Sequence, residues 1–395
     1  MRTLEGRLFA AADQSAEGAV LLTGATGFVG MELLARLLER TQRPVVALVR
    51  ATDDANAQER LRRTVTALLG SCEPHEHRLV ALCADIERPA LQLDISTDEL
   101  AAVVTDIVHG AASVSFERGL PESRAINVDG TRRMLELAAL CRTRGQLRSF
   151  SYISTAYVAG KHHGRFHEDE LEVGQGFRNP YERTKFEAEQ LVRAHATDLP
   201  ITIFRPSIIV GDRRTGWTSA FNVLYGPLRA FSQGAYRVVP ARRSALVDAV
   251  SVDYVADAIF ALLTTRAGDG LTYHLTAGDD ATTVGELVDL SAELLERPAP
   301  VSLPPALYRR ALHPLLVRTA GARRRRMLQR TEAYFPYFAV DTVFDDARAR
   351  ATLGPMGVRR APLDTYFHRL VEFAGRSRWG RETVTRHAAR VEAAR

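Results

Sequence analysis

The chain has 395 residues, of which 46% are hydrophobic and 25% are charged, and its formal net charge at pH 7 is +5. This composition is typical of a folded globular protein and excludes disordered and fibrous classes. No run of 18 apolar residues occurs, and no basic segment leads into an apolar stretch near the N-terminus, so neither a membrane-spanning helix nor a secretion signal is predicted. We therefore expect a cytoplasmic protein with one large or two modest domains.

Strand-like and helix-like segments alternate over the first two hundred residues. Short apolar runs typical of buried strands occupy residues 19–24, 44–50, 78–86, 106–112, 147–154 and 201–206. Longer stretches with helical character lie between them, at residues 31–40, 55–65, 128–142 and 181–196. This alternation predicts an α/β fold, a doubly wound parallel Rossmann sheet with helices on both faces.

The alternation breaks after Pro206, where a stretch containing glycine and aromatic residues begins. It resumes briefly at residues 245–263 and then gives way to a tail rich in proline and arginine. We therefore predict a second, smaller and mainly helical substrate domain built from two separate segments. The predicted NADP-binding domain comprises residues 1–210 and 245–275, and the substrate domain comprises residues 211–244 and 276–395.

The sequence TGATGFVG at residues 23–30 joins the first predicted strand to the first predicted helix. Gly24, Gly27 and Gly30 recur in it at three-residue spacing. Free N–H groups and the helix dipole face a ligand at such a helix N-terminus, and missing side chains let a pyrophosphate approach. The turn therefore predicts a dinucleotide site.

The end of the second predicted strand indicates which dinucleotide is bound. Arg50 stands where an NAD-preferring domain usually has an acid for the ribose 2′-hydroxyl, and a guanidinium there suits a 2′-phosphate. This favours NADPH. Asp53 and Asp54 are alternative ribose ligands, but we interpret them as caps of the following helix. Asp85 and Ile86 end the third strand, where they either contact adenine or serve as a turn aspartate and a core isoleucine.

A candidate catalytic group lies further along the chain. Tyr181 and Lys185 are four residues apart, on one face of a predicted helix, and Thr155 ends a predicted strand 26 residues before Tyr181. A phenol can give a proton to a carbonyl oxygen, while a lysine lowers the pKa of that phenol and holds the nicotinamide ribose. The threonine hydroxyl would orient the same oxygen. This set predicts hydride chemistry on a carbonyl.

At this point the sequence resembles the extended short-chain dehydrogenase/reductase family along most of its length. Within that family it is most similar to the branch of thioester reductases and fatty acyl-CoA reductases. The chain departs from the common pattern at Gly110, where many relatives have asparagine. The matching segments are TGATGFVG, LVRA, VHGAA at 108–112, INVDGT at 126–131, YISTAYVAG, YERTK, FRPSIIVG at 204–211, GWTSAFN, VSVDYVADAI at 250–259 and PYFAVDTVFDDARARATLGPMGV.

The resemblance implies NADPH-dependent reduction of an acyl thioester, carried by coenzyme A or by a carrier protein, to an aldehyde. A second hydride would carry the aldehyde on to an alcohol. Tyr181 and Thr155 would stabilise the oxyanion, and Lys185 would also contact the cofactor. The implied cofactor-binding residues are Thr23, Gly24, Thr26, Gly27, Phe28, Val29, Gly30, Arg50, Arg60, Asp85, Ile86, Ala111, Ala112, Asn127, Lys185, Pro206, Ser207 and Ile208.

Two other functions remain open at this point. The first is a dehydrogenase or epimerase on the same scaffold, acting on a nucleotide sugar or a sterol-like alcohol. The second is a non-catalytic NADP sensor or scaffold protein, although such a protein would be expected to lose Tyr181 or Lys185. An assay of NADPH oxidation with acyl thioesters, aldehydes and nucleotide sugars distinguishes the three.

Several conspicuous residues have less specific interpretations. His162, His163 and His167 lack a regular ligand spacing, so we predict a solvated loop and no metal site. Trp217 and Phe221 either line an acyl tunnel or pack within the small domain.

The stretch 302–330 is strongly basic, with apolar residues between its arginines and no acid. We expect it to form a helical cap over the acyl entrance, where its charge suits the phosphates of coenzyme A, an acidic carrier protein or an anionic membrane surface. Nucleic acid is not predicted as a partner, since no binding module is recognisable. The arginines are Arg309, Arg310, Arg318, Arg323, Arg324, Arg325, Arg326 and Arg330.

Overall fold

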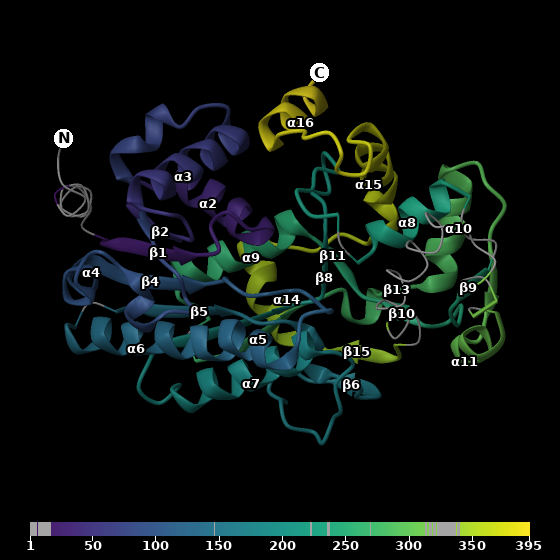
Figure 1. The fold of residues 1–395 in the computed structure, drawn as a ribbon, viewed down its shortest axis with the longest axis horizontal. Coiled ribbons are helices and arrows are strands. Elements are labelled where there is room, and N and C mark those ends of the chain that lie inside the picture. Colours follow the sequence, from purple (N-terminus) through teal and green to yellow (C-terminus); the bar gives the residue numbers. More distant parts are fainter. Residues whose placement is uncertain are drawn as a thin grey trace.

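The computed structural model describes residue 6 and residues 17–145, 147–221, 223–234, 238–268, 270–312, 314, 315, 318, 321, 337 and 340–395. Its centre is a parallel sheet in the order β12-β7-β5-β4-β1-β2-β3, seen in Figure 1. The predicted α/β class and Rossmann sheet are thus confirmed. The strands are β1 (Ala19–Thr23), β2 (Val45–Val49), β3 (Leu79–Cys83), β4 (Val104–His109), β5 (Ser149–Ile153), β7 (Ile201–Pro206) and β12 (Thr272–Leu275).

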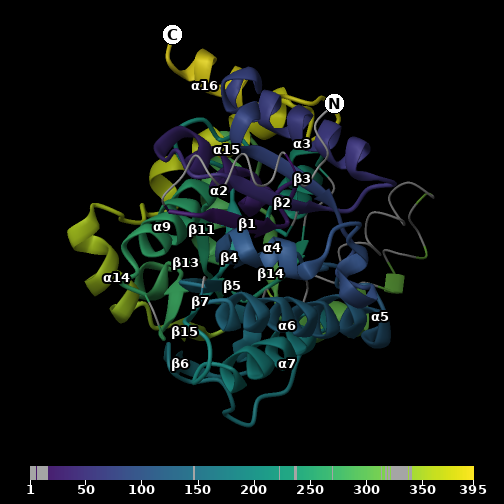
Figure 2. The same ribbon diagram turned by 90° about the vertical axis from the view of Figure 1, so that its left-hand side faces the viewer.

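Helices cover both faces of this sheet, as the apolar strands require. One face carries α2 (Phe28–Arg40), α3 (Asp54–Leu69) and α9 (Val252–Thr265). The other carries α4 (Thr97–Val103), α6 (Gly130–Thr143) and α7 (Pro180–Ala194), and α5 (Leu120–Arg124) lies beside α7. Figure 2 shows the two helical layers on either side of the strands.

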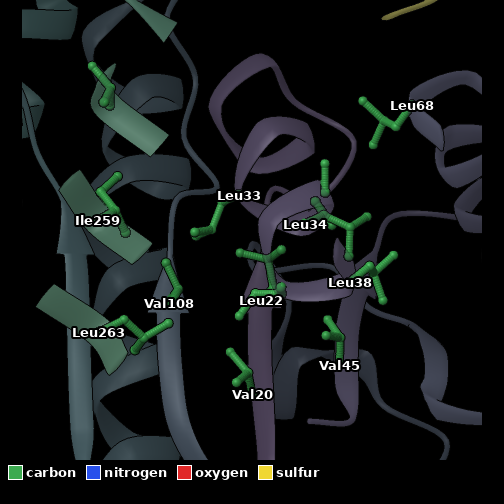
Figure 3. Packing of buried hydrophobic residues seen from close by; sticks show 14 of the residues in the cluster. Val20, Leu22, Leu33, Leu34, Leu38, Val45, Leu68, Val108, Ile259 and Leu263 are labelled. Carbon is green, nitrogen blue, oxygen red and sulfur yellow. The ribbon is translucent and has the colours of Figure 1, made fainter. Parts of the chain in front are cut away.

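The core on the first face is built from aliphatic side chains that meet between β1, β2, β4 and the helices. Leu33, Leu34 and Leu38 of α2 pack in one cluster with Val20 and Leu22 of β1 and Val45 of β2 (Figure 3). All of these side chains are almost fully buried. Because α2 is held in this way along its length, its N-terminal end is fixed at the carboxyl edge of the sheet.

Several helices begin with local side-chain caps that their sequences supply. Asp53 caps α3 by accepting a hydrogen bond from the Asn56 backbone nitrogen at 2.7 Å, so its interpretation as a cap is confirmed. Asn179 caps α7 by accepting one from the Glu182 backbone nitrogen at 2.9 Å. The capping fixes the first turn of α7, which carries Tyr181.

Smaller paired strands and helices extend beyond the carboxyl edge of the sheet, on the right of Figure 1. The pairs are β6 (Gly164–Phe166) with β15 (Thr342–Phe344), β8 (Ile208–Val210) with β11 (Ala249–Ser251), β9 (Val238–Pro240) with β14 (Val301–Leu303), and β10 (Leu246–Val247) with β13 (Thr282–Thr283). Among the remaining described residues, the α-helices are α8 (Tyr225–Ser232), α10 (Val284–Leu294), α11 (Pro305–Leu307), α14 (Ala347–Leu353), α15 (Asp364–Arg376) and α16 (Arg386–Ala393).

These outer elements do not all lie together. Side chains of α8, α10, α15 and β10 share one apolar cluster, whereas α14 contacts α9 and β12, and α16 contacts α3. The domain boundaries given above remain a prediction. The part of the chain that the structure describes contains no helix long and apolar enough to cross a membrane. Of the basic stretch 302–330, Arg323 to Arg326 and Arg330 lie outside the described residues.

Candidate active site

The site lies at the carboxyl edge of the sheet, where β1 is flanked by β2 on one side and by β4 on the other. β2 and β3 are added on one side of β1, and the chain then crosses back so that β4, β5, β7 and β12 are added on the other side. In open parallel sheets, ligands bind in the crevice that such a reversal creates. The predicted glycine turn follows β1 at this point.

The glycine turn leaves no room for side chains. Gly24 has φ +75°, and a Cβ on Gly30 would lie 2.0 Å from the Gly24 carbonyl oxygen. Gly27 is the N-cap of α2, where no side chain caps the helix and no acid occupies the first turn. The first N–H groups of α2 therefore face a site suited to an anion.

Thr23 has a structural role in this turn. Its hydroxyl accepts hydrogen bonds from the backbone nitrogens of Gly110 and Ala111, at 3.1 and 3.0 Å, and lies 2.8 Å from His109 Nδ1. Burial lowers the pKa of His109 to about 3, so its imidazole is neutral. Since Thr131 donates to the Asn127 carbonyl, His109 donates from Nε2 to Thr131 and accepts from Thr23 at Nδ1.

Gly110 is tightly enclosed as well. A Cβ at this position would lie 3.0 Å from the Ile153 Cδ1 atom. An asparagine there would therefore require the Ile153 side chain to move. Ala111 and Ala112 follow directly and are half-buried, so they line the edge of the same crevice.

The residues predicted to select the cofactor lie beyond β2. Arg50 is 78% exposed, and its guanidinium is 3.8 Å from a Glu87 carboxylate oxygen. Arg60, on α3, is also exposed and donates a hydrogen bond to the Arg50 carbonyl. The Arg50 side chain is thus exposed at the end of β2, and Arg60 holds its backbone.

Asp85 and Ile86 follow β3, and both make contacts with other residues of the protein. An Asp85 carboxylate oxygen accepts a hydrogen bond from the Glu87 backbone nitrogen at 2.9 Å, as in a turn. Ile86 packs against Gly130, and its carbonyl accepts from Arg133 at 2.9 Å. The structure therefore gives both residues the structural roles named as alternatives above, and their contact with adenine stays a prediction.

The structure brings Thr155, Tyr181 and Lys185 together. Tyr181 and Lys185 lie one turn apart on α7, and Thr155 follows β5. The Thr155 hydroxyl donates to the Pro206 carbonyl at 3.3 Å and lies near enough to the Tyr181 phenol to lower its pKa. Thr155 and Lys185 are each only 3% exposed, whereas Tyr181 is half-buried.

Lys185 is held on one side by β5. Its Nζ donates to the Tyr152 hydroxyl at 2.8 Å and to the Ile153 carbonyl at 2.7 Å. An ammonium has three donors, so one remains for a ligand as far as the described residues go. Tyr152 was not predicted from the sequence, although it lies only three residues before Thr155.

Burial governs the protonation of both groups on α7. It lowers the pKa of Lys185 to about 7, against the opposing charge of Glu189. It raises the pKa of Tyr181 to about 12, although the Thr155 hydroxyl acts in the other direction. At neutral pH the Tyr181 phenol therefore keeps its proton, and Lys185 is near the middle of its titration.

A buried ion-pair network lies under these residues and was also missed. Glu189 is fully buried, accepts from Ser154 at 2.6 Å and pairs with Arg205 at 2.6 Å. The charge of Arg205 keeps the pKa of Glu189 below its ordinary value despite burial. The spacing of Lys185 and Glu189 along one helix was the available signal for their proximity.

The remaining predicted cofactor residues lie on several different elements. Asn127 is buried, bonds both backbone groups of Ser113 and donates to Thr184 at 2.9 Å, so it fixes the segment after β4 against α7. Pro206, Ser207 and Ile208 connect β7 to β8. Thr26, Phe28 and Val29 belong to the glycine turn and the start of α2.

An apolar pocket opens beyond β8, between α8, α10, β9 and β10. Its wall includes Tyr157, Ile208, Leu228, Val288 and Tyr337. Trp217 packs against Phe28 in the main core, and Phe221 stacks on Phe373. Neither residue lines this pocket; Trp217 packs in the main core instead of within the small domain, and Phe221 packs against α15.

The three loop histidines take separate contacts. His163 pairs with Asp341 and His167 with Asp345, at 2.8 and 2.9 Å. Both histidines are exposed, and His162 bonds the Arg165 carbonyl. Within the described part of the chain, no group of three or more His, Cys, Asp or Glu residues is arranged to hold a metal ion.

Comparisons with known proteins extend these observations. Residues 22–259 match the model of a family described as male sterility protein. An isonitrile lipopeptide synthase of Streptomyces coeruleorubidus is 38% identical over 214 residues, which cover 53% of this chain and 14% of that protein. Fatty acyl-CoA reductase 1 of Homo sapiens is 29% identical over 302 residues, which cover 66% of this chain and 58% of that protein.

A solved structure matches over a larger share of the chain. It is the terminal R domain from the myxalamid PKS-NRPS biosynthetic pathway, with a TM-score of 0.78 and 25% identity over 95% of this chain and 98% of that one. The chain thus spans nearly all of this domain but less than two thirds of either curated relative. The family match runs from β1 to α9 and includes Thr155, Tyr181 and Lys185.

Proposed function

The chain belongs to the male sterility protein family and is an oxidoreductase of the short-chain dehydrogenase/reductase type, and on this premise we propose that it reduces an acyl thioester to an aldehyde with NADPH. The observation that carries the proposal is the meeting of three features at one edge of the sheet. These are the glycine turn, the group of Thr155, Tyr181 and Lys185, and the apolar pocket beyond β8. A nucleotide sugar is disfavoured because that pocket offers it few polar groups.

The residues present fit a bound NADPH. The uncapped start of α2 suits the pyrophosphate, exposed Arg50 suits the 2′-phosphate, and the third donor of Lys185 suits the nicotinamide ribose. When bound, the cofactor would supply a hydride to the carbonyl carbon of the thioester. No metal is needed for the steps that follow.

The side chains act on the carbonyl oxygen. Tyr181 donates its proton to that oxygen as negative charge develops there, and the Thr155 hydroxyl hydrogen-bonds the same atom. The Lys185 ammonium stabilises the phenolate left on Tyr181, which is then reprotonated from solvent. The resulting hemithioacetal loses its hydroxyl proton, its carbon–sulfur bond breaks, and the sulfur leaves as a thiol. One thioester, one NADPH and one proton thus give one aldehyde, one thiol and NADP⁺.

The reaction is tested by following NADPH oxidation with an acyl-CoA, an acylated carrier protein, a free aldehyde and a nucleotide sugar. We expect turnover with a thioester, and analysis of the organic product identifies aldehyde or alcohol. Turnover of the nucleotide sugar alone would overturn the proposal.

Replacing Tyr181 with Phe tests its assigned role. Loss of a positioned proton donor should lower kcat by roughly 10² to 10⁴. The dissociation constant for NADPH should change little, because the assigned contacts to the cofactor come from other residues. Near-normal turnover in the variant would contradict the assignment of Tyr181.

Replacing Arg50 with Ala tests the choice of NADPH over NADH. Since a charge-assisted contact at an exposed site is lost, NADPH should bind about tenfold more weakly, while NADH, which lacks the phosphate, should be unaffected. Arg63→Ala is the matched control, because Arg63 is equally exposed on α3 and pairs with Glu59. Equal weakening of both cofactors would mean that Arg50 has only a structural role.

A further inference from the structure

The pocket beyond β8 is lined mainly by aliphatic and aromatic side chains. Eighteen of the residues that the structure describes line its wall, and none of these carries a charged side chain. Hydroxyl groups come only from Tyr157, Ser291 and Tyr337 among the described lining residues. The Ser291 hydroxyl already donates to the Leu287 carbonyl at 2.5 Å, and that of Tyr337 donates to Glu182 at 2.7 Å. The wall thus offers a ligand little besides hydrocarbon contact.

Aromatic side chains link this pocket to the catalytic group. Tyr157 and Tyr337 line the pocket with ring centroids 5.3 Å apart, and Phe116 stacks on Tyr337 at 5.4 Å. Phe116 in turn contacts the ring of Tyr181 at 5.9 Å. In addition, the Tyr157 backbone nitrogen donates to the Thr155 hydroxyl at 3.3 Å. These contacts place the pocket wall directly beside Thr155 and Tyr181, the two residues that would hold a substrate carbonyl.

Resting on the function proposed above, we propose that this pocket binds an unsubstituted aliphatic acyl chain, so that the substrate is a fatty acyl thioester and not a peptidyl thioester. A peptidyl chain would bring amide groups against a wall whose Ser291 and Tyr337 hydroxyls are already engaged. Burying an amide without a hydrogen bond opposes binding, whereas each buried methylene favours it. The uncharged wall equally opposes ionised amino-acid side chains.

The first experiment compares pantetheine thioesters whose acyl chains increase in length from acetyl to dodecanoyl, together with a dipeptidyl thioester of similar size. We expect kcat/KM to rise about fourfold for each methylene that enters the pocket and then to level off. The dipeptidyl thioester should be turned over at least tenfold less efficiently than the fatty acyl thioester of equal length. Equal or better turnover of the dipeptidyl substrate would overturn the proposal.

Variants of α10 test whether this pocket sets the preference. Val288 is half-buried in the wall, and Val288→Phe should fill part of the space. The chain length of best turnover should fall by several carbons, so that dodecanoyl turnover falls far more than acetyl turnover. Leu294→Phe is the matched control, because Leu294 lies on the same helix, is 40% exposed and is not part of the wall. An unchanged length profile in a folded Val288→Phe protein would overturn the assignment.

A binding measurement separates this proposal from the reaction itself. Dodecyl pantetheine thioether cannot be reduced, so its calorimetric binding to the full chain in the presence of NADPH does not depend on turnover. We expect it to bind at least a hundredfold more tightly than methyl pantetheine thioether, and Val288→Phe should remove most of the difference. If the two thioethers bind alike, the pocket proposal fails even where thioesters are reduced. If only the long thioether binds and no thioester is reduced, the proposed reaction fails while the pocket proposal stands.

Discussion

Lys185 is one of only two lysines in a chain that has 52 lysines and arginines in total. An arginine at this position would stay charged at every accessible pH, whereas burial brings the pKa of Lys185 to about 7. The other lysine, Lys161, is exposed. Of the two lysines, Lys185 is thus the one with a pKa near neutrality, and it is also the one that contacts β5 and lies one turn from Tyr181.

The depressed pKa of Lys185 predicts how stability depends on pH. An unfolded lysine has a pKa of about 10.4, so between pH 7 and 10 the unfolded chain binds more protons than the folded one. Stability contributed by Lys185 therefore rises with pH across this window. Relative to Lys185→Met, the free energy of unfolding of the cofactor-free wild type should increase by about 2 to 4 kcal/mol from pH 7 to pH 10.

Urea denaturation at several pH values measures this difference. Lys161→Met is the control, because Lys161 is exposed. A flat profile for Lys185→Met would mean that the Lys185 ammonium is solvated in the folded protein.

Which site residues could be predicted from the sequence depends on how local their geometry is. Tyr181 and Lys185 were predictable because four residues on a helix make one turn, and Arg50 because it directly follows a strand. Tyr152 was not, since its contact with Lys185 joins β5 to α7 and depends on how that helix packs. Thr23 lies in a sequence motif typical of cofactor contact. Its hydroxyl, however, accepts hydrogen bonds from the segment that follows β4.

The glycine turn joins β1 to α2, and its glycines let the start of α2 lie close to the end of β1. A Cβ on Gly30 would meet the backbone of Gly24, and backbone cannot rotate away as a side chain can. Any larger residue must therefore move the start of α2 relative to β1. The N–H groups that face the proposed pyrophosphate move with it.

Gly30→Ala should weaken NADPH binding by more than tenfold and destabilise the protein by about 1 to 3 kcal/mol. Gly375→Ala is the matched control, because its Cβ would lie in open space within α15. That variant should be neutral or more stable by about 0.5 to 1 kcal/mol. Cofactor titration and thermal unfolding measure both effects, and wild-type affinity in Gly30→Ala would show that α2 can shift without loss of the site.

At the scale of elements, strands rich in apolar residues were easier to predict than short strands with polar residues. The six predicted strands became β1, β2, β3, β4, β5 and β7, because each is rich in apolar residues and almost fully buried. The edge strand β12 was missed, since Thr272–Leu275 is short and includes His274. The pair of β6 with β15 joins segments nearly 180 residues apart, and no local pattern specifies such a contact.

Over the whole molecule, the last helix closes back onto the nucleotide-binding half. Figure 1 shows α16 beside α2 and α3, although it follows them by more than three hundred residues. Arg386 of α16 is buried, and its guanidinium pairs with Glu32 at 2.7 Å and with Glu39 at 3.1 Å. Because both acids lie on α2, this contact ties the end of the described chain to the helix that begins at the glycine turn.

Arg386→Ala should therefore destabilise the protein far more than the loss of an ordinary surface charge. Removing one partner of a buried ion pair leaves the other uncompensated, which costs about 3 to 5 kcal/mol. The lower value is expected here, because Glu32 keeps its pair with Arg36. Arg390→Ala is the control, since Arg390 is 40% exposed and its pair with Glu39 should contribute less than about 1 kcal/mol. Equal urea midpoints for the two variants would mean that α16 is held by its apolar contacts, and that the Arg386 ion pairs contribute no more than the exposed one.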